Sequence, residues 1–297
     1  MRSMNDRRQI HRRRTTSTRP EGSAVQPASA ERVQKLLARL GYGSRREIES
    51  WISAGRVRID GRGANLGDRI SDPRQVTLDG KSLPAVATAP TPRVLIYHKP
   101  VGQITSRRDP EGRDSVFEHL PRPRQGRWVA VGRLDINTQG LLLLTTDGEL
   151  AHRLMHPSSA VEREYAVRVR GPVAPEELAK LQSGVELDGE HLSFRTIVDA
   201  GGEGSNHWYH VVLAEGRNRE VRRLWETIGA QVSRLLRVRY GPVALPRRLR
   251  AGRSLELDPA SLAELYRAVD LPPPAASPAA KSTVAQRRAR TGSPRRR

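Results

Sequence analysis

The chain has 297 residues, contains no cysteine and carries a formal net charge of +20 at pH 7. A charge of that size favours a polyanionic partner over a neutral small molecule, with nucleic acid as the leading candidate. The lack of cysteine excludes disulfides, thiolate nucleophiles and cysteine-ligated zinc, and the eight histidines show no metal-ligand spacing. No apolar stretch reaches the roughly 18 residues of a membrane span, and no apolar segment follows the arginine-rich N-terminus as in a secretory signal. We therefore expect a soluble cytoplasmic protein.

Both ends of the chain are predicted to be disordered basic tails, residues 1–30 and 271–297. Each is rich in Arg, Pro, Ser and Ala without apolar periodicity, so neither buries enough surface to offset its ordering entropy. The first tail has seven Arg against two acids and the second has six Arg and one Lys, so +5 and +7 leave +8 for residues 31–270. The tails serve either solubility or non-specific attraction to phosphate, and the folded part is basic by itself.

Residues 31–90 are predicted to form a small domain followed by a linker. Apolar residues recur with helical spacing over residues 33–40, and the S-x-x-E pattern of Ser44 and Glu47 predicts a capping box that begins a second helix. In RVRIDGR, apolar and basic residues alternate before an Asp60-Gly61 hairpin turn. We therefore expect two helices and a short strand pair.

Arginines mark this small domain as a candidate for RNA binding. Arg45 and Arg46 fall in the first turn of the second predicted helix, where the helix dipole attracts anions, although a solvated helix start is the alternative. The segment ERVQKLLARLGYGSRREIESWISAGRVRIDG resembles the S-four-type RNA-binding module, named after a ribosomal protein of the small subunit. The resemblance implies that Arg45, Arg46, Arg56 and Arg58 contact structured RNA.

Residues 91–270 are predicted to form a larger α+β domain. Strand-like pieces alternate with helical ones, the former including RVLIYHKP, EYAVRVRG and HWYHVVLAEG and the latter GELAHRLMHP, PEELAKLQSG and REVRRLWETIG. Short strands split by helices and hairpin-like turns predict a mixed, mostly antiparallel sheet with flanking helices. The glycine patterns of dinucleotide and NTP sites are absent from the sequence.

A cluster of arginines accompanies the last of these predicted helices. Its apolar residues repeat at i, i+3, i+4 and i+7, namely Val221, Leu224, Trp225 and Ile228. Arg219, Arg222 and Arg223 stand at i, i+3 and i+4 on an adjoining face, and Arg217 adds a fourth cation after Gly216. Guanidinium groups on one stripe repel each other unless an anion lies across them, so the cluster predicts a phosphate or carboxylate partner.

Two further residues are candidates for chemistry. Asp135 stands in GRLDINTQGLLLLTTDGEL beside Asn137 and Gly140, where a lone acid could simply shape a turn. Tyr165 alternates with Val167 in EYAVRVR, which predicts either a core aromatic residue or a stacking surface for an RNA base. Neither residue is decisive alone.

Three long motifs together resemble the ribosomal RNA pseudouridine synthases, specifically the large-subunit synthase B branch of the small-subunit-synthase-A family. They are VGRLDINTQGLLLLTTDGELAHRLMHP, REYAVRV and EGRNREVRRLWETIGAQVSRLLRVRYGP, and the likeness covers nearly all of residues 31–270. It implies that Asp135 is the essential aspartate, Tyr165 the active-site tyrosine and Arg222 the basic residue pairing with the aspartate. Arg133 would contact RNA near the extruded nucleotide.

The implied function is site-specific isomerisation of uridine to pseudouridine in large-subunit (23S) ribosomal RNA, free or in an assembling particle. The family's usual form is a monomer. The reaction detaches uracil from its sugar, turns it and rejoins it through carbon, so we expect no cofactor, metal or thiol. Asp135 would serve as a nucleophile or base kept ionised by nearby cations, whether it attacks the sugar, attacks the ring or abstracts a sugar proton. Arg217, Arg219 and Arg223 are expected to contact the RNA.

One position departs from the wider superfamily, which often carries Gln before the motif arginine where this chain has Glu220. Two other functions stay open. The first is an RNA-binding assembly factor with a vestigial pocket. The second is DNA binding through the tails, which lack a recognition-helix pattern. The target uridine and the maturity of the RNA substrate do not follow from the sequence.

Overall fold

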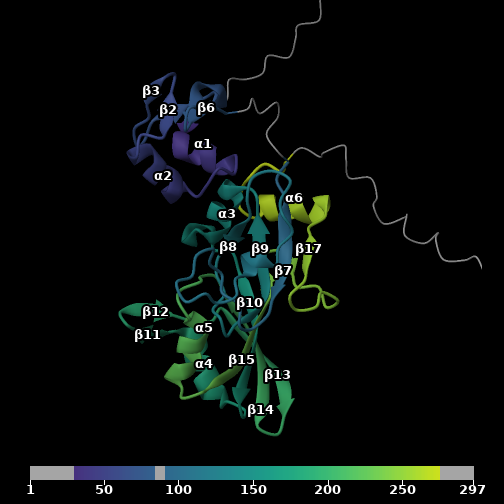
Figure 1. Cartoon of the computed structure of the whole chain (residues 1–297). Coiled ribbons are helices and arrows are strands. Elements are labelled where there is room, and N and C mark those ends of the chain that lie inside the picture. Colours follow the sequence, from purple (N-terminus) through teal and green to yellow (C-terminus); the bar gives the residue numbers. More distant parts are fainter. Residues whose placement is uncertain (1–29, 84–90, 275–297) are drawn as a thin grey trace, which may run out of the picture.

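The computed structural model describes residues 30–83 and 91–274, so nearly all of both predicted tails lies outside the described residues. A small domain formed by residues 31–83 lies against one end of a larger one (Figure 1). Leu271, assigned above to the C-terminal tail, packs against the core and donates its N–H to the Tyr266 carbonyl at 3.0 Å. Within the described ranges, no helix is long and apolar enough to cross a membrane.

The small domain contains the two predicted helices, α1 (Val33–Arg39) and α2 (Arg45–Ser53). Ser44 caps α2 and forms the expected capping box with Glu47, and Asp60 and Gly61 both have positive φ angles, 47° and 81°, in the predicted turn. The sheet is larger than the predicted strand pair. Its order is β3 (Arg62–Gly63), β2 (Val57–Ile59), β5 (Val76–Leu78) and β6 (Lys81–Ser82), and β1 (Glu31–Arg32) pairs separately with β4 (Arg69–Ile70).

The large domain is built on a nine-stranded sheet, which confirms the predicted α+β fold. The path is β13 (Thr196–Glu203), β14 (Asn206–Leu213), β10 (Arg163–Arg170), β15 (Val232–Tyr240), β9 (Gln139–Thr145), β7 (Val94–Lys99) and β17 (Ser254–Glu256), with β8 (Val129–Val131) on β9 and β16 (Val243–Ala244) on β15. All pairs are antiparallel except β9 with β15. The flanking helices are α3 (Gly148–Met155), α4 (Pro175–Ser183), α5 (Glu220–Thr227) and α6 (Pro259–Arg267), and β11 (Val185–Leu187) and β12 (Glu190–Leu192) form a separate hairpin.

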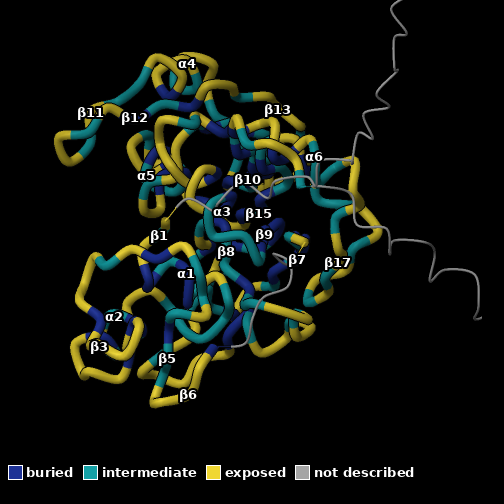
Figure 2. The backbone as a smooth tube through the Cα atoms, turned by 90° about the horizontal axis from the view of Figure 1, so that it is seen from above, coloured by how far each residue is buried: buried dark blue, intermediate teal, exposed yellow. Residues whose placement is uncertain are grey.

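The four consecutive leucines of β9 belong to two hydrophobic cores. Leu142 and Leu144 pack with the aromatic residues beneath α5, whereas Leu141 and Leu143 pack with α3 and α6. Side chains alternate across a strand, so a central strand covered on both faces is apolar at every position. The dark blue backbone around β9 and β15 shows this buried centre (Figure 2).

Strands β9 and β15 approach each other closely at Gly140. Their parallel pairing joins Gln139 to Leu236 and Gly140 to Arg237. A Cβ on Gly140, whose φ is 109°, would lie only 2.3 Å from the Arg237 carbonyl oxygen, so no other residue fits without moving the backbone. This contact places the loop that precedes β9 beside the middle of β15.

Candidate active site

A pocket of about 720 Å³ lies over the centre of the large sheet. Asp135 lines it from the loop before β9, Tyr165 from β10 and Arg237 from β15. The segment that leads into α5 lines another side and carries both signs of charge, with Glu215, Arg217, Arg219 and Glu220. Residues far apart in the sequence thus place several guanidinium groups in the same pocket as the Asp135 carboxylate.

The main chain around Asp135 is held from below by Lys99, which is fully buried at the end of β7. Its ammonium donates to the carbonyls of Asp135 at 3.0 Å, Thr138 at 2.8 Å and Pro100 at 3.0 Å. Burial lowers the pKa of Lys99 to about 8, and the negative charge of Asp135 acts in the opposite sense. At neutral pH the lysine is therefore still a charged donor that fixes the loop carrying Asp135.

A second contact fixes the loop from the other side. The Thr105 hydroxyl donates to the Leu134 carbonyl at 3.2 Å and lies 3.3 Å from the Leu134 N–H. The half-buried Asp135 side chain makes no hydrogen bond or ion pair with any residue that the structure describes. The carboxylate is therefore positioned through its backbone and is free to meet a substrate.

Arg222, on α5, reaches the same loop. It donates to the carbonyls of Asn137 and Val232, both at 3.0 Å, rather than to the Asp135 carboxylate, and its Nε is buried without a partner. Burial and the neighbouring Arg219 lower the pKa of Arg222, whereas Asp135 raises it. The two opposite charges therefore act on each other without direct contact, and a closer pairing between them stays a prediction.

Tyr165 lies in the pocket wall and is only 8% exposed. Its ring belongs to the core cluster with Val167 and Val169, which confirms the predicted inward face of β10. Its role as the active-site tyrosine is not tested by this packing.

A family model described as RNA pseudouridylate synthase matches residues 93–227, and an S4 domain model matches residues 31–72. Ribosomal large subunit pseudouridine synthase B of Escherichia coli strain K12 is 56% identical over 251 residues, which cover 84% of this chain and 86% of that protein. The protein of the same name from Yersinia pestis is 57% identical over 231 residues, 77% and 73% of the two chains. The chain belongs to the RNA pseudouridine synthase family.

A solved structure agrees with this assignment. The crystal structure of a pseudouridylate synthase superimposes with a TM-score of 0.55 at 26% identity and covers 79% of this chain and 99% of that one. The chain is thus an enzyme, an isomerase that converts uridine in RNA to pseudouridine.

Several buried charges of this synthase were not singled out from the sequence. Arg163 and Arg237 are 6% and 3% exposed, line the pocket and stack on the Tyr240 ring, with guanidinium carbons 5.0 and 5.1 Å from its centre. Arg237 donates from Nε to the Leu141 carbonyl at 2.7 Å, and its Nη2 is buried without a partner. Arg163 stands two residues before Tyr165, so strand periodicity placed it on the inward face and could have identified it.

Glu220 is also buried, at 5% exposure, where the wider superfamily often has Gln. Its Oε2 accepts the Arg217 N–H at 2.9 Å, and burial raises the pKa of its carboxyl. Burial therefore favours the protonated form of this carboxyl more than in an exposed glutamate.

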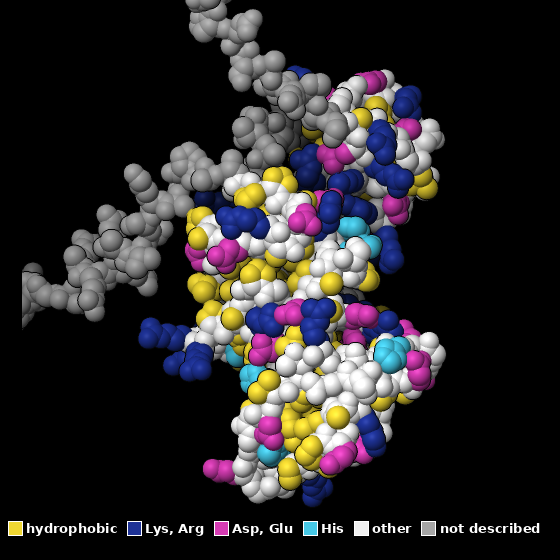
Figure 3. Space-filling view, turned by 180° about the vertical axis from the view of Figure 1, so that it is seen from behind, with side chains coloured by type: hydrophobic (Ala, Val, Ile, Leu, Met, Phe, Trp, Pro, Cys, Tyr) yellow, Lys and Arg dark blue, Asp and Glu magenta, His cyan; other side chains and the backbone are white. Residues whose placement is uncertain are grey.

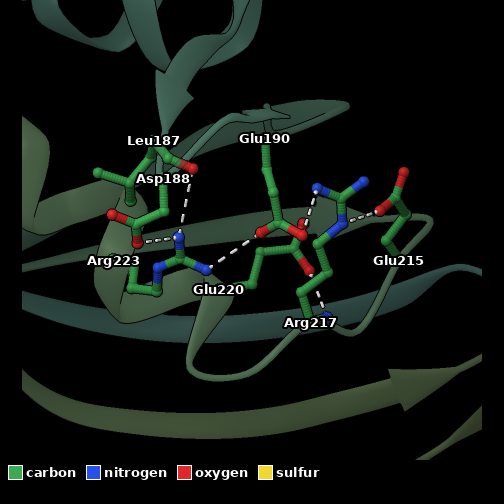
Figure 4. Close-up of polar contacts among 7 residues, drawn as sticks. All are labelled: Leu187, Asp188, Glu190, Glu215, Arg217, Glu220 and Arg223. Carbon is green, nitrogen blue, oxygen red and sulfur yellow. Dashed lines mark hydrogen bonds and ion pairs between the residues drawn. The ribbon is translucent and has the colours of Figure 1, made fainter.

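The structure corrects the prediction that Arg219, Arg222 and Arg223 share one face of a helix. Arg219 is the residue before α5, with a φ of 50°, and its guanidinium lies 3.8 Å from Glu226. Arg223 instead pairs with Asp188 at 2.8 Å and Glu190 at 3.4 Å on the β11–β12 hairpin (Figure 4). Protein carboxylates thus supply anions to Arg219 and Arg223, whereas Arg222 donates to neutral carbonyls.

Arg217 belongs to the same network and pairs with Glu190 at 3.2 Å and Glu215 at 2.6 Å (Figure 4). Contacts of Arg217, Arg219 and Arg223 with RNA stay predictions, and Arg217 and Arg223 would need to exchange these carboxylates for phosphates. Arg133, in contrast, is exposed at the pocket wall.

The four arginines predicted to bind RNA in the small domain differ in availability. Arg56 forms a bidentate pair with Asp79 at 2.8 and 2.6 Å, and Arg58 donates to the Gly61 carbonyl at 2.9 Å. Arg45 and Arg46 are exposed at the start of α2.

Among the residues described, no group of three or more His, Cys, Asp or Glu is placed to hold a metal ion.

Proposed function

We propose that this synthase isomerises a specific uridine in large-subunit ribosomal RNA, with Asp135 as its catalytic carboxylate. The relatives at 56–57% identity are named for the ribosomal large subunit. The observation that carries the proposal is the position of Asp135 in a pocket whose other charged groups are mainly arginines, on a loop held by Lys99. Such a carboxylate is preorganised to act on a bound substrate.

The pocket is large enough to receive an extruded nucleotide. Extrusion costs a few kcal/mol, which stacking on the pocket wall at Tyr165 and phosphate contacts at Arg133 would offset. The bond from the uracil nitrogen to the sugar then breaks, the ring turns, and a bond forms from the sugar to a ring carbon. That carbon loses its proton and the freed ring nitrogen gains one, so the composition of the nucleotide is unchanged. Asp135 acts as the nucleophile or base, and Tyr165 orients the base or carries a proton.

We further propose that the enzyme acts in the cytoplasm as a monomer without a cofactor. The isomerisation leaves the atoms and the oxidation state of the nucleotide unchanged, so no external group or electron carrier takes part. The charged side chains of the pocket supply the electrostatic stabilisation that the reaction requires.

The test is pseudouridine mapping of ribosomal RNA by carbodiimide modification and primer extension. Cells lacking the protein are compared with cells that express the wild type, Asp135→Asn or the control Asp60→Asn, which makes the same change in a turn where Asn is equally favoured. We expect one large-subunit site to be lost on deletion and restored by the wild type and Asp60→Asn only.

Binding of a ribosomal RNA fragment to purified Asp135→Asn shows whether lost activity reflects chemistry rather than affinity. Full activity of Asp135→Asn would refute the role of the carboxylate. An unchanged map together with intact RNA binding would favour the assembly-factor hypothesis instead.

A further inference from the structure

The small domain touches the large one through a tight backbone contact. A Cβ on Gly41 would lie 2.8 Å from the Cα of Gly126, so the loop after α1 meets the loop before β8 at van der Waals distance. Two ion pairs flank this contact, Lys35 with Glu149 at 3.1 Å and Glu47 with Arg108 at 2.7 Å. Surface pairs of this kind contribute little energy, so their main effect is on the orientation of the domains.

Docking brings together four arginines from the two domains, which we call the junction cluster. They are Arg45 of α2 and Arg107, Arg108 and Arg127 of the large domain. Glu47 pairs with Arg108 at 2.7 Å and interacts electrostatically with Arg107 and Arg127, and Arg45 interacts with Arg127. Four guanidinium groups and one carboxylate leave a local net charge of +3. Lys and Arg side chains are also gathered along the boundary between the domains on the face shown in Figure 3.

The cluster contains positive charge that the described residues do not neutralise. Arg127 is half-buried, yet its guanidinium forms no hydrogen bond or ion pair with any of them. Arg107 is held in place by the Trp128 carbonyl at 2.5 Å and by the Phe117 ring, whose centre lies 4.1 Å from its guanidinium carbon. Burial lowers the pKa of both arginines, and their mutual repulsion adds to the effect on Arg107. A partly desolvated cation without a protein partner gains stability from a nearby anion, so this arrangement favours a bound anion.

The junction cluster is connected to the catalytic loop by short stretches of chain. Arg107 follows Thr105 by two residues, and the Thr105 hydroxyl bonds to Leu134, the neighbour of Asp135. Arg127 directly precedes Trp128 and strand β8, which leads to the same loop. An anion held in the cluster is therefore at a fixed position relative to Asp135.

We propose that the junction cluster binds a backbone phosphate of the substrate RNA, and that docking of the small domain sets the spacing between this phosphate and the uridine at Asp135. The inference rests on the proposed RNA substrate. A phosphodiester fits better than a protein carboxylate because the cluster combines the N-terminal end of α2 with several forked donors, and because the chain as a whole carries +20. The enzyme would thus select a uridine whose distance from the bound phosphate matches the distance between the junction cluster and Asp135.

The first test removes the unpaired charge. Arg127→Gln is compared with Arg247→Gln, an identical change at an exposed arginine of the large domain, using the full-length protein and a ribosomal RNA fragment that contains the target. We expect Arg127→Gln to weaken RNA binding by about five- to tenfold near 0.1 M salt and to reduce the salt slope by roughly 0.7 to 0.9. Arg247→Gln should change the affinity less than twofold and leave the single-turnover rate at saturating RNA unchanged. Equal affinities of the two variants would contradict the assignment of Arg127 to a phosphate site.

The second test disturbs docking without removing any charge. Gly41→Ala forces a Cβ against Gly126, whereas the control Gly55→Ala imposes a similarly positive φ, 70° against 91°, with nothing within 4 Å of the new Cβ. Circular dichroism establishes that both variants are folded at the assay temperature. We expect Gly41→Ala to lose RNA affinity by about as much as Arg127→Gln, with Gly55→Ala close to the wild type.

The outcomes separate this inference from the proposed function. If Arg127→Gln binds RNA like Arg247→Gln, or Gly41→Ala like Gly55→Ala, while the wild type still forms pseudouridine, the junction cluster is not a phosphate site and the proposed function stands. If the wild type forms no pseudouridine although the variants show the expected losses of affinity, the proposed function fails and the RNA site remains.

Discussion

Replacing Lys99 by Met tests how the loop that carries Asp135 is held. The buried ammonium donates to three carbonyls, those of Pro100, Asp135 and Thr138, and Met keeps the length of the side chain but no donor. With about 1 kcal/mol for each hydrogen bond, the free energy of unfolding should fall by about 3 kcal/mol. The loop would also lose its anchor, so the single-turnover rate should fall more than RNA affinity does.

Urea denaturation followed by circular dichroism measures the change in stability, with Lys180→Met as the matched control. Lys180 is an exposed lysine on α4 whose one ion pair with the described residues is to Glu177, so its replacement should alter the free energy of unfolding by less than about 0.5 kcal/mol. Equal stability of the two variants, with an unchanged catalytic rate, would refute the assigned role of Lys99.

The pKa of Lys99 also predicts how the free energy of unfolding depends on pH. The pKa is about 8 in the folded protein against 10.5 for an unperturbed lysine. Between these pH values the unfolded chain binds more protons, so the stability contributed by this group rises with pH, by up to about 3 kcal/mol in total. The difference in unfolding free energy between the wild type and Lys99→Met should therefore increase from pH 8 to 10.5, and a flat difference would contradict the burial of a charged lysine.

Three further variants test other parts of the site. Burial raises the pKa of Glu220, so the folded state binds its proton more tightly and this group's contribution to stability falls as pH rises above 4.5. Glu220→Gln should remove that contribution, measured as a shallower decrease in unfolding free energy between pH 4.5 and 7 relative to the wild type. Arg223→Gln should release the β11–β12 hairpin by deleting the pair with Asp188, at a cost of about 1 kcal/mol, and hydrogen exchange should become faster in residues 185–192 but not in α4. Tyr165→Phe keeps the buried ring, so unfolding free energy should stay within about 0.5 kcal/mol while the single-turnover rate falls at least about tenfold. An unchanged rate would assign Tyr165 to packing alone.

Much of the local structure was predictable because it depends on residues close together in the chain. The Ser44 and Glu47 capping box and the Asp60-Gly61 turn each involve atoms within four residues, and both are found where the patterns placed them. The apolar face of α5 followed from the same short-range periodicity.

The partners of the charged residues were not predictable in this way. Lys99 and Asp135 are separated by 36 positions, and Arg223 meets Asp188 across 35. A motif identifies such residues as important but cannot say which atoms their charges meet. Arg222 shows the difference, because resemblance paired it with Asp135 and the fold directs it to two carbonyls.

The sequence by itself therefore determined the basic character of the protein, its local helices and turns, its family resemblance and the identity of the candidate aspartate. Only the tertiary structure decided that the leucines after Asp135 fill two opposite cores and that a buried lysine holds the aspartate's loop. It also decided that arginines of the large domain meet Glu47 of the small one. The physical reason is separation along the chain. Backbone propensities act between residues a few positions apart. Burial and electrostatic pairing instead depend on which distant segments the sheet and the domain contact bring together.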